Sequence, residues 1–208
     1  MINRRLVIGM SGASGAVYGI RLLEALRPLP IETHLVMSKS AELTLAYETE
    51  HKVAHVQALA DVCHPASDVG ASIASGSFQA LGMVVAPCSI RSMAEIATGV
   101  TSSLLTRAAD VTLKERRRLV LMVRETPLHT GHLRNLLALS EMGAIIAPPV
   151  PAFYALPQSV EALVDQTVGR VLDLFEIDSP LVKRWGEATD EKGKVLRGPR
   201  RAKQGSGS

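Results

Sequence analysis

Small and hydroxyl-bearing residues follow the first apolar run of the chain, and their spacing suits the binding of a phosphate. An apolar run at residues 6–8 leads into SGASG at residues 11–15, and apolar residues at helical spacing come next. The order is therefore strand, tight turn and helix. A helix that starts at Ser14 or Gly15 would direct its unpaired N–H groups and positive dipole end toward the end of the strand, where an anion binds.

This turn matches neither of the two common phosphate-binding motifs. It lacks the GxGxxG spacing of the dinucleotide fingerprint, and no Gly-Lys-Ser/Thr follows it as in a P-loop. A phosphate-binding turn in another α/β mononucleotide fold remains. Taken alone, the motif is equally consistent with a glycine-rich turn that binds nothing.

Strand patterns alternate with helix patterns along the chain. Apolar runs predict further strands at 31–37, 83–86, 119–123 and 144–147, and Pro87 is expected to stop the third strand. Helices are expected after residues 14, 38, 89, 102 or 103, 129 and 159, several of them capped by serine. Residues 51–63 are ambiguous, and residues 65–78 are predicted to form a long loop. The pattern predicts a doubly wound parallel α/β sheet.

In such sheets the ligand binds beyond the carboxyl ends of the strands. The segments that follow the strands are polar, small or conformationally special: 11–15, Ser38, 87–89, 124–126 and 148–154. Because parallel strands end at one edge, these segments are expected to converge on a site.

Composition bounds the class of protein. The 208 residues suit one domain, which we place at 1–186, followed by a basic and flexible tail at 187–208. Apolar residues make up 47% and aromatics only 3%, as expected for a core of Ala, Val, Leu and Ile. The apolar content fits either a large core or a subunit interface. The final Gly-Ser-Gly-Ser resembles a remnant of recombinant expression.

Charge and cysteine content argue against several partners. Much of the formal charge of +3 comes from residues 192–203, and the scarcity of aromatics disfavours nucleic-acid binding. Cys63 and Cys88 form no metal-binding spacing and are expected to be reduced thiols in the cytoplasm. No apolar run approaches the ~20 residues of a membrane span.

Several ordered motifs resemble the UbiX-type flavin prenyltransferases, within the superfamily of flavin-containing cysteine decarboxylases. They are SGASGAVYGIRLL, MSKSAELTLAYET, ASGSF, PCSI, LLTRAADVTLKERRRLVLMVRETPLH, PPVPAFY and PQSVEALVDQTVGRVLD, and they span the chain to about Trp185. The resemblance implies a flavodoxin- or Rossmann-like three-layer α/β sandwich assembled as a homododecamer. The enzyme would join a dimethylallyl group, from dimethylallyl monophosphate, to N5 and C6 of reduced FMN without a metal. The prenylated FMN would serve a UbiD-type decarboxylase, in bacteria commonly within ubiquinone synthesis.

The resemblance also implies roles for individual residues. Ser14 and Glu48 would lie near flavin N5 for proton removal and charge stabilisation, and Glu125 would pass a proton to the departing phosphate. The FMN contacts would be Gly12, Ala13, Ser14, Ser38, Ser89, Arg107 and Arg124. The donor phosphate would be held by Lys114, Arg124, Tyr154 and Arg170, which come from four segments, as a pocket requires. Residues 74–77 would cover the prenyl group, and Trp185 would close over the site.

Each of these residues also has an interpretation that involves no binding or catalysis. Without the resemblance, Ser14 is a helix N-cap, Glu48 a surface residue, and Lys114 and Arg170 solvated charges. Some relatives carry a Trp where this chain has Asp68-Val69-Gly70, which removes an aromatic group for an allylic cation.

Other candidates for chemistry are weaker. His129 and His132 lack a third metal ligand at suitable spacing, and Cys88 lacks a local base, so we interpret Cys88 as pocket wall. Two alternative functions remain open: an FMN-dependent decarboxylase of a cysteine-containing substrate, and a flavin carrier without chemistry.

Overall fold

The apolar runs form one parallel sheet. In the computed structural model, which describes residues 4–184, six strands pair in the order β3-β2-β1-β4-β5-β6. The strands are β1 (Arg5–Met10), β2 (Glu32–Met37), β3 (Val62–Pro65), β4 (Gly82–Cys88), β5 (Arg118–Val123) and β6 (Ile145–Ile146). Every residue of the central β4 is buried, which explains its continuous apolar sequence. This order is that of the Rossmann sheet, so the predicted fold class is confirmed.

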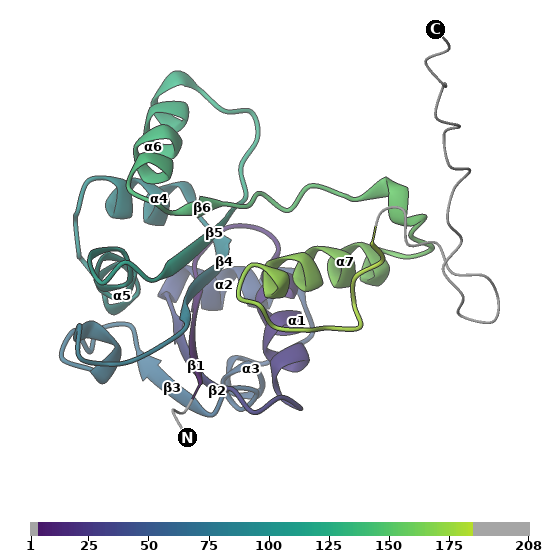
Figure 1. Cartoon of the computed structure of the whole chain (residues 1–208), viewed down its shortest axis with the longest axis horizontal. Coiled ribbons are helices and arrows are strands. Elements are labelled where there is room, and N and C mark those ends of the chain that lie inside the picture. The colour runs from purple at the N-terminus through teal and green to yellow at the C-terminus, as the bar shows by residue number, and fades with distance from the viewer. Residues whose placement is uncertain (1–3, 185–208) are drawn as a thin grey trace, which may run out of the picture.

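Helices cover both faces of the sheet and make three layers (Figure 1). One face carries α1 (Ala16–Leu26), α2 (Lys39–Glu48), α3 (Val53–Gln57) and α7 (Val160–Asp173), whose buried residues share one core. The other carries α4 (Ile90–Ala97), α5 (Leu104–Lys114) and α6 (Thr130–Glu141), with the short 3-10 turn η1 (Ser72–Ala74). A second 3-10 turn, η2 (Phe153–Ala155), lies between β6 and α7.

Serine caps begin the helices where the sequence predicts them. The hydroxyl of Ser38 accepts a hydrogen bond from the Ala41 N–H at 3.1 Å, and Ser159 caps α7 in the same way. Ser89 caps α4. Ser103, rather than Ser102, caps α5. These contacts span only three residues, which is why the sequence reveals them.

Three segments differ from the expectation. The ambiguous residues 51–63 contain α3 and the start of β3, and the predicted loop at 65–78 contains η1. The strand predicted to stop before Pro87 continues to Cys88, because an irregularity between Val85 and Cys88 accommodates a residue that cannot donate a hydrogen bond. Trp185 and the predicted tail at 187–208 lie outside the described residues.

The strand order places the expected ligand site. After the neighbouring strands β1 and β4 the chain turns to opposite faces of the sheet, into α1 and α4. This divergence is the topological switch point, and ligands of such sheets bind in the crevice beyond it.

Candidate functional site

Backbone hydrogen bonds join the segments that leave the strands. The Ser38 N–H donates to Met10 O at 2.9 Å, the Ser11 N–H to Pro87 O at 3.1 Å, and the Arg124 N–H to Cys88 O at 3.1 Å. The exits of β1, β2, β4 and β5 therefore lie side by side at one edge of the sheet. The structure thus brings the first four of the segments predicted to converge into a single row.

Glu48 occupies the anion site expected at the start of α1. Its Oε2 accepts hydrogen bonds from the N–H groups of Gly15 at 2.8 Å and Ala16 at 3.1 Å. Gly15, at φ +105°, is the N-cap residue, and as a glycine it has no side chain with which to cap the helix. The expectation that Ser14 is the N-cap is therefore wrong: the Ser14 side chain hydrogen-bonds the Glu48 carboxylate instead.

The surroundings of Glu48 keep it ionised. Its partial burial raises the pKa, but hydrogen bonds from Ser14, Gly15 and Ala16 and the charge of Arg124 outweigh this, so the pKa of Glu48 is lowered. Arg124 also lies near Tyr18, where burial raises the pKa of the phenol and the guanidinium opposes that rise. We call Ser14, Tyr18, Glu48 and Arg124 the Glu48 cluster.

The other residues expected to contact FMN divide into two groups. Gly12 packs so closely on α2 that an added Cβ would lie 2.3 Å from the Ser40 Cβ. Ser38 and Ser89 stand at the starts of α2 and α4, beside the Glu48 cluster at the exit edge. Arg107 lies on α5 and pairs with Asp110 at 2.9 Å.

Two of the four expected phosphate ligands belong to the segment between β6 and the end of α7. The Tyr154 hydroxyl accepts a hydrogen bond from Gln166 of α7 at 3.2 Å, and Arg170 lies one turn further along this helix. Arg170 pairs with Asp173, which also binds Arg184 through both carboxylate oxygens at 2.9 and 3.0 Å. The hydrogen bond from Arg184 is the largest influence on Asp173 and lowers its pKa, so the carboxylate stays ionised.

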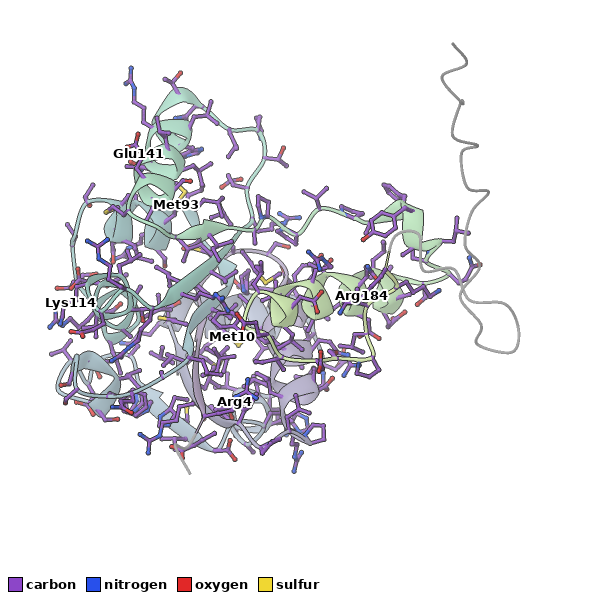
Figure 2. All side chains as sticks on the ribbon, in the orientation of Figure 1. Arg4, Met10, Met93, Lys114, Glu141 and Arg184 are labelled. Carbon is purple, nitrogen blue, oxygen red and sulfur yellow. The ribbon has the colours of Figure 1, made fainter. Side chains whose placement is uncertain are left out.

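Lys114 lies at the opposite end of the strands from Arg124. It ends α5, just before β5, whereas Arg124 follows the six residues of β5, a separation of about 20 Å at 3.3 Å per residue. Figure 2 shows Lys114 and Arg184 on opposite sides of the molecule. The four phosphate ligands therefore do not form a pocket within one chain, because the length of the sheet separates them.

The loop expected to cover the prenyl group accompanies Lys114. A Cβ on Gly76 would lie 2.7 Å from Lys114 Nζ, and Lys114 is paired with Glu115. Arg117 holds this loop by donating to Gly76 O at 2.8 Å and to Phe78 O. The expected phosphate ligands other than Arg124 therefore fall into two groups, which we call half-sites: Lys114 beside the 74–77 loop, and Tyr154 with Arg170.

Glu125 is exposed beside the Glu48 cluster. It directly follows Arg124, and its Oε1 accepts a hydrogen bond from the N–H of Thr126 at 2.9 Å. The carboxylate therefore faces solvent at the exit edge, where a partner or substrate can reach it.

The structure adds residues that the sequence did not single out. Tyr18 and Asp173 were unremarked helix positions, and no local pattern distinguishes them from other helix residues. Cys88 is fully buried, and burial raises the pKa of its thiol to about 12, so it is not a thiolate nucleophile. The ring centroids of His129 and His132 lie 3.6 Å apart, and the two rings are tilted by 32°.

Two features are absent from residues 4–184, one that would hold a metal and one that would cross a membrane. No group of three or more His, Cys, Asp or Glu side chains in this range is placed to hold a metal ion. No helix within the same range is both long and apolar enough to cross a membrane.

Comparison with known proteins gives consistent matches. Residues 1–172 match the Flavoprotein family. The flavin prenyltransferase UbiX of Escherichia coli K12 is 60% identical over 185 residues, covering 88% of this chain and 98% of that protein. The flavin prenyltransferase UbiX of Thauera aromatica is 55% identical over 181 residues, covering 87% of this chain and 93% of that protein.

Solved structures agree with these matches. AnUbiX (PadA1) in complex with FMN and dimethylallyl pyrophosphate is 55% identical, with a TM-score of 0.87 over 88% of this chain and 97% of that one. A dodecameric FMN-dependent UbiX-like decarboxylase from E. coli O157:H7 is 51% identical, with a TM-score of 0.85 over 87% and 98% of the two chains. Cypemycin decarboxylase, at 19% identity and a TM-score of 0.58 over 71% of this chain and 84% of that one, shares the fold alone.

Proposed function

Because the chain belongs to the UbiX-type flavin prenyltransferases of the Flavoprotein family, we propose that its exit-edge residues transfer a dimethylallyl group to reduced FMN. One observation carries the assignment: a relative that covers 88% of the chain at a TM-score of 0.87 is solved with FMN and dimethylallyl pyrophosphate. The Glu48 cluster lies at the switch point, where such a cofactor binds in this sheet order.

The exit edge has the chemistry that FMN requires. The turn at Gly12 packs closely on α2, and Ser38 and Ser89 cap α2 and α4, whose N-terminal N–H groups can bind a phosphate. We assign FMN contacts to Gly12, Ala13, Ser14, Ser38, Ser89, Arg107 and Arg124. Reduced FMN supplies the nucleophilic N5 and C6 that accept the dimethylallyl group.

The Glu48 cluster supplies charge. Glu48 is ionised at neutral pH, so it can stabilise positive charge on an allylic carbon and accept a proton when the second bond closes the ring. The Ser14 hydroxyl, bonded to Glu48, orients that carboxylate. We assign to Glu125, one residue after Arg124, the transfer of a proton to the departing phosphate.

The donor phosphate requires both half-sites. Since Lys114 and Arg170 lie on different sides of one chain, we propose that neighbouring copies bring Lys114 to the Tyr154–Arg170 half-site. A dodecameric relative supports this arrangement. So do apolar side chains that remain exposed on α6 and around η2: Leu133 at 53%, Leu137 at 60%, Phe153 at 71% and Leu156 at 74%.

The proposal also includes the dimethylallyl donor and the protein that receives the prenylated FMN. We propose dimethylallyl monophosphate as donor and a cytoplasmic UbiD-type decarboxylase, within ubiquinone synthesis, as the recipient of the product. The cysteine-decarboxylase alternative receives less support, because a solved FMN-dependent cysteine decarboxylase is only 17% identical, whereas flavin prenyltransferases are 55% and 60% identical. The carrier alternative predicts that FMN binding survives the loss of Glu125 with no change in any activity.

Mass spectrometry of the flavin tests the proposal. The protein is mixed anaerobically with reduced FMN and dimethylallyl monophosphate, or with the diphosphate in a parallel sample, and the released flavin is weighed. A gain of one dimethylallyl unit is expected, and Glu125→Gln should slow this gain while FMN stays bound. A flavin of unchanged mass with both donors would refute the transferase, and an unaffected rate in Glu125→Gln would remove that residue from the mechanism.

A further inference from the structure

Ser11 is a buried polar residue at the switch point. Only 2% of its surface is exposed, although it lies in the turn that follows β1. Its hydroxyl donates to Pro87 O at 3.0 Å and accepts from the Ser89 N–H at 2.7 Å. Its own N–H donates to the same Pro87 O at 3.1 Å. One side chain thus binds the β4 exit through both its donor and its acceptor.

These bonds extend the pairing of β1 with β4 beyond the regular ladder. The ladder between these strands ends at Gly9 and Val85. Past this point Pro87 has no N–H to donate, and the chains diverge toward α1 and α4 on opposite faces. The Ser11 hydroxyl therefore links the two exits where backbone pairing has stopped.

The link also determines how Ser89 is presented. With the Ser89 N–H held by Ser11, the Ser89 hydroxyl accepts from the Ser92 N–H at 3.2 Å and donates to the Ser92 hydroxyl at 3.2 Å. The backbone N–H and the hydroxyl of Ser89 are thereby both held, and these contacts orient the first turn of α4.

We propose that Ser11 is a positioning residue for the flavin: its hydroxyl sets the separation between the 12–15 turn and the N-terminus of α4. The two segments carry the FMN contacts assigned above, so this inference rests on the proposed function. Loss of the link would leave the Ser89 N–H without its buried acceptor and let the crevice change width. FMN affinity would fall even though Ser11 itself need not touch the flavin.

Matched variants separate positioning from general stability. Ser11→Ala removes the hydroxyl and Ser11→Thr keeps it. Thr33→Val removes a comparable hydroxyl. Thr33 is also only 2% exposed, and its hydroxyl donates to Asp61 Oδ2 at 2.9 Å and accepts from the Asp61 N–H at 3.0 Å. Thr33 is the second residue of β2, at the edge of the sheet away from the exits.

The measurements are the Kd for FMN, by fluorescence titration, and the thermal midpoint of each variant. We expect Ser11→Ala to weaken FMN binding about tenfold or more, as the loss of a buried hydrogen bond does. Thr33→Val should lower the thermal midpoint comparably and leave the Kd unchanged. Ser11→Thr should restore most of the affinity. If the added methyl prevents folding, Ser11→Cys should bind FMN more weakly than wild type.

Two results would overturn the inference. One is wild-type FMN affinity in Ser11→Ala. The other is an equal loss of affinity in Thr33→Val, since that would show an effect of stability alone. If the wild-type protein itself failed to bind FMN, the proposed function would fall first and this inference with it, so the two failures are distinguishable.

Discussion

Replacing Glu48 with glutamine tests the account of the α1 N-terminus. Glutamine keeps the length of the side chain and an oxygen that can accept from Gly15 and Ala16. It removes the charge that those N–H groups, the helix dipole and Arg124 stabilise. The perturbation therefore isolates charge from shape.

The magnitude follows from the contacts. Hydrogen bonds to a charged group contribute about 1.5–3 kcal/mol, against about 0.5–1.5 kcal/mol for neutral pairs. Because Glu48 is exposed, solvent screens the difference, and we expect the lower end: a loss of about 1 kcal/mol at neutral pH. For a domain of this size, 1 kcal/mol lowers the thermal midpoint by about 2–4 °C.

The pH dependence gives the sharper result. The pKa of Glu48 is lower in the folded protein than the value of about 4.3 expected in the unfolded chain. Its stabilisation is therefore fully present above the unfolded pKa and is lost as pH falls through the folded pKa. The difference between wild type and Glu48→Gln should be constant from about pH 6 upward and shrink below about pH 4.

Thermal unfolding at matched protein concentration, from pH 3 to 8, measures this difference. Glu50→Gln, which removes an exposed carboxylate two residues further along, is the control and should change the midpoint little. A gap that does not depend on pH, or a Glu48→Gln variant as stable as wild type at neutral pH, would refute the charge-based capping of α1.

Three further predictions follow from single contacts. Gly12→Ala should weaken FMN binding and destabilise the fold by about 1–3 kcal/mol, since its Cβ would lie 2.3 Å from that of Ser40; calorimetry and FMN titration check this. Alkylation of the native protein should modify the exposed Cys63 and spare the buried Cys88, whose pKa is raised to about 12, whereas the unfolded chain should react at both; intact mass distinguishes one adduct from two. Asp173→Asn should raise KM for the dimethylallyl donor severalfold with little change in the Kd for FMN, because the two arginines that it binds lose their fixed positions; an unchanged KM would contradict that positioning.

The sequence by itself determined the parts of this protein that depend on short-range contacts. Serine caps act over three residues, as at Ser38 and Ser159, and apolar runs of a few residues form strands wherever the sheet places them. The ordered motifs identified the family for the same reason, since they are read along the chain. Fold class, helix starts and the set of candidate residues were therefore predictable.

Only the tertiary structure decided which of those residues meet. Glu48 caps a helix whose N-cap residue lies 33 residues earlier, and Ser11 binds an N–H 78 residues away. Lys114 and Arg124 are near in sequence, yet β5 carries them to opposite edges of the sheet. Strand order and register determine these distances. Both arise from packing the whole sheet, and no local pattern records them.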